Sequence, residues 1–195
     1  MATVLKPAPD FKAPTVFNMT FEDMTLKDLY GGKQWLVFFF YPADFTFVCP
    51  TELIAFSDSI ELFHKIDCNV AACSTDTVYT HFAWISQPRK EGGLGEMKIP
   101  IVADHNLKIS KDYGVLIEDG TALRGLFIID PKGIVRHITI NDQPIGRSVN
   151  ETLRVVKALQ HFEKHGEVCA VNWQEGDDTI KPDPIGAKEY FSKHN

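Results

Sequence analysis

The residues with the clearest chemical potential are two cysteines in contrasting surroundings. The chain has four cysteines, Cys49, Cys68, Cys73 and Cys169. Cys68 and Cys73 lie in an apolar segment, where cysteine usually behaves as a small hydrophobic residue. Cys49 directly precedes Pro50 at the predicted start of a helix, whereas Cys169 lies in a polar segment near the C-terminus. No pair has C-x-x-C spacing, so the pattern favours neither a thioredoxin-type dithiol nor a zinc ribbon.

The position of Cys49 suits nucleophilic chemistry. At the start of a helix, free N–H groups and the positive end of the helix dipole stabilise an anion, and the thiolate is the nucleophilic form of cysteine. Thr46, three residues earlier, is placed to hydrogen-bond to the sulfur or to its target. No histidine lies nearby in sequence, so a local Cys–His relay is not indicated. Position alone leaves two interpretations open, a reactive thiolate and a buried cysteine that happens to start a helix.

The hydrophobic pattern predicts the elements that must position Cys49. Residues 33–41 read Trp, Leu, Val and three Phe in sequence without helical period, which predicts a buried strand. Residues 50–66 carry apolar side chains at three- and four-residue steps, which predicts an amphipathic helix with Pro50 in its first turn. The remaining predictions are a small hairpin within residues 1–32, strands at 68–74, 99–103, 124–130 and 134–140, and helices at 77–87, 106–113 and 148–165.

The order of these elements predicts an α/β fold, since strands and helices alternate before a final hairpin and helix. Residues 131–133, Pro-Lys-Gly, join the last two strands, so these strands should run antiparallel and make the sheet mixed. We therefore expect a thioredoxin-like fold with a central mixed β-sheet flanked by helices and a C-terminal tail. Residues 1–165 are predicted to form the main domain, and residues 166–195 an extension carrying Cys169.

Composition excludes several classes of protein. The chain of 195 residues is 44% hydrophobic and 24% charged, with a net charge of −6, which is typical of a globular protein and argues against binding to nucleic acid. Its longest apolar run, residues 35–41, is far shorter than the ~20 residues that span a bilayer. The N-terminus lacks the apolar stretch of a signal peptide, and the last residues match no retention or peroxisomal address. We expect a soluble, cytoplasmic protein without a membrane partner.

Motifs along essentially the whole chain resemble one family. Residues 42–52, Pro-Ala-Asp-Phe-Thr-Phe-Val-Cys-Pro-Thr-Glu, resemble the peroxidatic-cysteine signature of peroxiredoxins. The resemblance continues through Gly92–Gly95, Arg124–Asp130, Gly146–Val149, His165–Cys169 and Tyr190–Phe191. The sequence is similar to typical two-cysteine peroxiredoxins of the eukaryotic, overoxidation-sensitive type.

The resemblance implies a thiol peroxidase that uses no metal, haem or flavin. Cys49 would attack the O–O bond of a peroxide and become a sulfenic acid. Thr46, the backbone N–H of Cys49, and Arg124 match the family's donors, and a guanidinium suits the oxygen on which negative charge develops. Pro42 would shield the sulfur from water. Position alone favours a surface arginine at a strand end for Arg124, and the alternative role of Pro42 is simply to end the strand.

Two further residues would support the site. Glu52, one turn into the predicted helix, would orient Arg124 and Arg147. An alternative role for Glu52 is simply to place a carboxylate at the positive end of the helix dipole.

The resemblance gives Cys169 the role of resolving cysteine. It would form a disulfide between subunits, which implies a head-to-tail homodimer and, by family likeness, a decamer. Thioredoxin is the expected reductant, although a glutathione-linked donor stays open, and sulfiredoxin is a potential repair partner. Ala170 departs from the proline that usually follows this cysteine. The acidic stretch Glu-Gly-Asp-Asp at residues 175–178 departs from the usual lysine-containing run.

Two segments match features of overoxidation-sensitive members. These are the loop of Gly92, Gly93, Leu94 and Gly95 and the pair Tyr190 and Phe191. An aromatic pair packed over the Cys49 helix would slow disulfide formation and leave the sulfenic acid open to further oxidation to sulfinic acid. The alternative for the glycines is an ordinary loop. The alternatives for Tyr190 and Phe191 are a frayed chain end or core packing unrelated to regulation.

Two other functions compete with the peroxidase. One is a binding or holdase protein with an oligomeric surface, to which exposed aromatics such as Phe45 and Tyr79 would contribute. The other is a thioredoxin-fold disulfide reductase, which the missing C-x-x-C pair disfavours.

Overall fold

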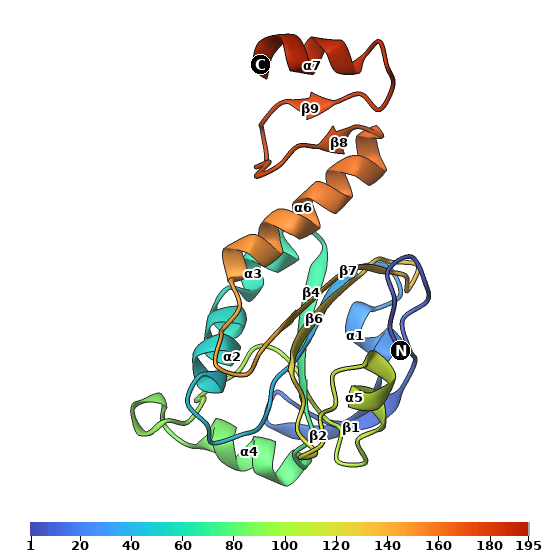
Figure 1. Ribbon diagram of the computed structural model, residues 1–195. Helices are drawn as coiled ribbons and strands as arrows, with labels where there is room; N and C mark the ends of the chain where they lie inside the picture. Colours follow the sequence, from blue (N-terminus) through green and yellow to red (C-terminus); the bar gives the residue numbers. More distant parts are fainter. Residues whose placement is uncertain (195) are drawn as a thin grey trace. The chain divides into compact units, whose positions relative to one another are not determined.

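The computed structural model describes residues 1–194 (Figure 1). Contacts divide the chain into two compact units, Met1–Arg147 and the residues from Ser148 onward. The division at residues 165 and 166, expected from the sequence, stays a prediction. In the part of the chain that the structure describes, every helix is too short or too polar to span a bilayer.

The first unit is built on a seven-stranded sheet with the order β2-β1-β5-β4-β3-β6-β7. Its strands are β1 (Lys12–Phe17), β2 (Thr20–Thr25), β3 (Trp35–Phe40), β4 (Cys68–Ser74), β5 (Ile101–Ala103), β6 (Arg124–Ile129) and β7 (Val135–Asn141). Strand β3 pairs parallel to β4 and antiparallel to β6. The predicted mixed sheet and both predicted hairpins, β1–β2 and β6–β7, are confirmed.

Helices cover both faces of this sheet, as Figure 1 shows. They are α1 (Leu26–Tyr30), α2 (Cys49–Asp58), α3 (Ile60–His64), α4 (Val78–Ser86) and α5 (Lys108–Tyr113), with a short 3₁₀ helix at Arg89–Glu91. The prediction of one helix over residues 50–66 is wrong. Ser59 leaves the helical conformation, with φ −92° and ψ 4°, and ends α2 while it begins α3. The apolar period runs through this break because both helices bury the same stripe, so periodicity alone could not reveal it.

Strand β3 carries the core of the first unit. All six of its residues are buried, and alternate side chains point to opposite faces of the sheet. On one face Phe38 and Phe40 pack against Tyr113 of α5 at ring distances of 5.3 and 5.2 Å. On the other face Phe39 stacks on Phe56 of α2 at 4.7 Å. Burying each such ring contributes about 1.5–3 kcal/mol, so this stacking fixes the helix that begins with Cys49.

The second unit begins with the long helix α6 (Val149–His165). The Ser148 hydroxyl accepts a hydrogen bond from the Glu151 N–H at its start, and Gly166, with φ 70°, ends it in the left-handed conformation. Both ends agree with the sequence prediction.

The segment after Gly166 is more ordered than its composition predicts. Where the sequence predicts only a polar C-terminal tail, the chain forms β8 (Val168–Cys169), β9 (Thr179–Ile180) and α7 (Ala187–His194). Strands β8 and β9 pair antiparallel. Two-residue strands are too short to show an alternating pattern, which is why the sequence did not reveal them.

Candidate active site

The buried thiol of Cys49 is the first residue of α2. Strand β3 ends at Phe40, the chain crosses a loop that includes the buried Pro42, and α2 starts at Cys49 with Pro50 in its first turn. As the first helical residue, Cys49 has a backbone N–H without an intrahelical acceptor. Its side chain has no exposed surface, and its sulfur is a free thiol. The sulfur therefore lies at the positive end of a helix, away from bulk water.

Arg124 contacts the sulfur directly. Its Nη1 donates to Cys49 Sγ at 3.3 Å. The same atom donates to Glu52 Oε2 at 2.7 Å, and Nε donates to the Gln143 carbonyl at 2.6 Å, so the guanidinium is fixed in place. Arg124 is only 3% exposed, which rules out the alternative of a surface arginine at a strand end.

Glu52 joins two arginines into one buried cluster. Besides Arg124, it accepts from the Arg147 backbone N–H and Nε at 2.7 and 2.8 Å and from Nη2 at 2.8 Å. Burial alone would raise the pKa of Glu52, but the hydrogen bonds and charge of Arg147, with the charge of Arg124, hold this pKa below its ordinary value. One carboxylate thus faces two guanidinium groups. The cluster keeps an excess positive charge beside Cys49.

Thr46 shapes the loop before Cys49. Its hydroxyl donates to the Ala43 carbonyl at 2.8 Å. A hydroxyl has one proton, so in this orientation Thr46 presents acceptor lone pairs to any ligand and is not the donor that the family resemblance implied. Phe45, next to it, has a positive φ of 55°, and the loop must therefore be held by other contacts.

A buried polar network that sequence reasoning missed holds this loop. Asp44 accepts from the Tyr41 hydroxyl at 2.7 Å and lies 2.7 Å from His81 Nδ1. Its backbone N–H donates to Asp76 at 2.8 Å. Burial raises the pKa of Asp44 against the opposing influence of His81. The helical period of residues 77–87 puts His81 on or near one face with Trp84 and Ile85, but only the folded chain brings it to Asp44.

Cys169 lies in the second unit, on β8. Its sulfur is partly exposed and donates to the Ala158 carbonyl of α6 at 3.7 Å. Burial raises the pKa of this thiol, and the charge of Arg154 acts in the opposite direction. Ala170 accepts a hydrogen bond from the Trp173 N–H at 3.2 Å, so a turn follows the cysteine even without the family's proline.

The loop of Gly92, Gly93, Leu94 and Gly95 is closely fitted in the first unit. Leu94 has no exposed surface, and the Gly92 carbonyl accepts from Trp84 Nε1 at 2.8 Å. A Cβ on Gly93 would lie 2.1 Å from the Gln87 carbonyl oxygen. Glycine is therefore required at this position for close backbone approach.

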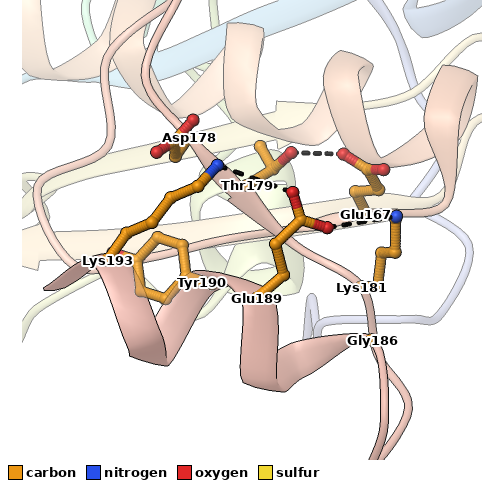
Figure 2. A pocket seen from close by; sticks show the side chains of 8 residues that line it. All are labelled: Glu167, Asp178, Thr179, Lys181, Gly186, Glu189, Tyr190 and Lys193. Atoms are coloured by element: carbon orange, nitrogen blue, oxygen red, sulfur yellow. Dashed lines mark hydrogen bonds and ion pairs between the residues drawn. The ribbon is translucent and has the colours of Figure 1, made fainter. Parts of the chain in front are cut away.

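Tyr190 and Phe191 lie on α7 in the second unit. Their rings meet edge to face at 5.9 Å, and Tyr190 stacks on His194 at 4.2 Å. Figure 2 shows Tyr190 at a charged pocket, where Glu189 lies between Lys181 and Lys193 at 3.6 and 3.5 Å. The Lys181–Glu189 pair ties α7 to the chain that follows β9, so α7 is a docked helix rather than a frayed end.

Among residues 1–194, no group of three or more His, Cys, Asp or Glu side chains is arranged to hold a metal ion. The residues that meet at Cys49 instead supply hydrogen-bond donors and positive charge. These groups suit a reaction in which negative charge develops on oxygen.

The buried thiol at a helix start, the guanidinium against it and the mixed sheet define a thiol peroxidase with a thioredoxin-like fold. Residues 4–138 match the model of the AhpC/TSA family, and residues 158–193 match that of the C-terminal domain of 1-Cys peroxiredoxin. The chain therefore belongs to the peroxiredoxin family, and its substrate is a peroxide.

Three similar proteins support this identification. Peroxiredoxin-2 of Bos taurus is 57% identical over 195 residues, which cover 100% of this chain and 97% of that protein. The reduced 2-Cys peroxiredoxin of Plasmodium vivax has a TM-score of 0.94 at 44% identity, covering 97% of this chain and 98% of its own. Thioredoxin peroxidase I of Plasmodium yoelii has a TM-score of 0.79 at 42% identity, covering 89% of this chain and 100% of its own.

Proposed function

We propose that Cys49 is the peroxidatic nucleophile and that Arg124, Thr46 and Pro42 complete its site. The observation that carries this proposal is the hydrogen bond of 3.3 Å from Arg124 Nη1 to Cys49 Sγ at the start of α2. The buried Pro42 keeps water from the sulfur, and Glu52 with Arg147 fixes the guanidinium of Arg124.

The reaction follows from these positions. The Cys49 thiolate attacks one peroxide oxygen, the S–O bond forms and the O–O bond breaks. Negative charge develops on the departing oxygen, where Arg124 and the N–H groups of α2 stabilise it. Thr46 accepts the hydrogen bond of the peroxide O–H. The departing oxygen takes a proton and leaves as water or an alcohol, and Cys49 becomes a sulfenic acid.

Cys169 of a second copy then resolves the sulfenic acid. Its thiolate attacks the oxidised sulfur, the S–S bond forms, the S–O bond breaks and water leaves. A homodimer with two intersubunit disulfides is the product. Thioredoxin is the proposed reductant, which the name of the Plasmodium yoelii relative supports.

The remaining roles extend this proposal. Phe45 and Tyr79, exposed by 50% and 74%, offer apolar surface for assembly of dimers into a decamer. The loop of Gly92, Gly93, Leu94 and Gly95 and the helix that carries Tyr190 and Phe191 slow resolution and permit sulfinic acid formation, for which sulfiredoxin is the proposed repair partner. We place the protein in the cytoplasm.

Two substitutions test the proposal. Cys49→Ser should abolish peroxide consumption and leave the circular dichroism spectrum unchanged. Cys169→Ser should retain one turnover but lose the peroxide-induced, dithiothreitol-reversible dimer on a non-reducing gel. A disulfide-linked dimer that persists in Cys169→Ser would show that Cys169 is not the resolving cysteine. Native peroxide turnover in Cys49→Ser would refute the site.

A further inference from the structure

An apolar groove runs beside the second cysteine. Helix α6 and β8 line it with Val155, Ala158, Leu159, Phe162 and Val168, and Arg154 and Cys169 complete the lining. Arg154 is the charged member of this set. A charge acts more strongly on its neighbours beside apolar surface than in open water.

Arg154 is held by contacts within its own unit. Its Nε and Nη2 donate to the two carboxylate oxygens of Glu151 at 2.6 and 2.7 Å, one turn earlier on α6. Its Nη1 donates to the Trp173 carbonyl at 3.3 Å. The side chain is 21% exposed, compared with 57% for Glu151. Hydrogen bonds from three nitrogen atoms therefore fix the orientation of the Arg154 guanidinium.

The Trp173 contact links Arg154 to the segment that carries Cys169. Trp173 is 3% exposed, and its indole N–H donates to the Asp177 carbonyl at 3.2 Å. Its backbone N–H closes the turn at Ala170, in which Asn172 adopts a positive φ of 58°. The residues from Cys169 to Trp173 are thus anchored at their far end by the tryptophan and by Arg154.

We propose that Arg154 is a positioning residue for the resolving step: it anchors the Cys169–Trp173 turn on α6 and stabilises the anionic sulfur of Cys169. The proposal rests on the function proposed above for Cys169. The attacking group in that step is the thiolate, so Cys169 must lose its proton before the S–S bond forms and the sulfenic oxygen leaves as water. Burial disfavours this loss, and the charge of Arg154 opposes the burial.

The first test measures Cys169 alone. In the Cys49→Ser background, the rate of iodoacetamide alkylation at Cys169 is followed by peptide mass spectrometry across pH. Arg154→Gln should move the profile to higher pH and slow alkylation at neutral pH about two- to fivefold, the effect of a partly exposed charge. Arg154→Lys should restore most of the rate. Glu151→Gln should move the profile to lower pH, because it removes the negative charge beside Arg154.

A matched control separates this effect from general loss of positive charge. Lys157 lies on the same helix and pairs with Glu175 at 2.7 Å. Lys157→Gln should leave the Cys169 profile unchanged. A shift in Lys157→Gln equal to that in Arg154→Gln would overturn the proposal, because general loss of positive charge would then explain both. A shift in Glu151→Gln in the same direction as that in Arg154→Gln would also overturn it, because the sign of the removed charge would then not matter.

The second test uses the chain with all four cysteines. After a single peroxide addition, Arg154→Gln should form the disulfide dimer more slowly and yield more sulfinic acid at Cys49 by intact mass. If the dimer forms at the native rate in Arg154→Gln but is lost in Cys169→Ser, the role of Arg154 is refuted and that of Cys169 stands. If the dimer persists in Cys169→Ser, the proposed function itself fails.

Discussion

Replacing Arg124 by methionine tests the electrostatic basis of the site. Methionine keeps much of the side-chain volume but removes the charge and the donor that lies 3.3 Å from Cys49 Sγ. Opposite unit charges at this distance attract by about 5 kcal/mol at an effective dielectric constant of about 20. Glu52, 2.7 Å from the same nitrogen, offsets part of this attraction. The net loss should therefore approach that of one donor to a developing oxyanion, about 10²–10³-fold in rate.

The assay is a stopped-flow reaction of the reduced protein with hydrogen peroxide. The second-order rate constant is obtained from intrinsic fluorescence under single-turnover conditions, and intact mass identifies the oxidised species. Arg124→Met should lower this rate constant by about 10²–10³-fold. Arg124→Lys should recover part of the loss, since it restores the charge without the planar set of donors.

Arg147→Met is the matched control. It removes a guanidinium from the same carboxylate, because Arg147 Nε donates to Glu52 Oε1 at 2.8 Å, but leaves the group that contacts the sulfur. It should slow the reaction less than Arg124→Met. Thermal unfolding of both variants identifies any loss of the fold. If folded Arg124→Met reacts as fast as Arg147→Met, the guanidinium at the sulfur does not drive the chemistry.

Three further predictions concern stability and access. The lowered pKa of Glu52 means that its ion pairs stabilise the fold above its ordinary value of 4.5 and that this stabilisation is lost as pH falls through the lowered value. Glu52→Gln, which leaves buried guanidinium groups unpaired, should therefore lower the free energy of unfolding by about 3–5 kcal/mol at neutral pH, measured with urea, and by less in acid. Glu189→Gln removes the ion pairs of Glu189 with Lys181 and Lys193 shown in Figure 2, each of which contributes at most about 1 kcal/mol. Hydrogen exchange of the α7 amides should therefore accelerate in this variant, and in the native protein at high salt. Unchanged exchange would show that these ion pairs do not hold α7 in place. Burial raises the pKa of the Cys68 and Cys73 thiols, so iodoacetamide should label them only after denaturation, and labelling in the native protein would show that they are accessible.

Spacing in the sequence was enough to predict Cys49 at the start of a helix, and the family motif around it was needed to favour a reactive thiolate over a buried structural cysteine. A buried strand, a loop and a helix with Pro50 in its first turn place the thiol at the positive end of a helix dipole, and local pattern predicts each of these elements. The family motif at residues 165–169, together with the polar segment after α6, predicted the resolving role of Cys169, which stays a prediction. The mixed sheet followed from the order of strands and helices together with the turn between β6 and β7.

The tertiary structure decided which side chains meet at the sulfur. Arg124 and Arg147 lie far along the chain from Glu52, and their contacts depend on β6 lying beside β3, which the antiparallel register establishes. The same holds for His81 and Asp44, since periodicity predicts burial but does not name a partner. The local hydrophobic pattern indicates which face of a helix or strand is apolar. The partners of a buried charge are determined by strand order and by the free-energy cost of leaving that charge unpaired. The sequence by itself thus located Cys49 and its helix, and only the folded chain determined which charged groups surround the sulfur.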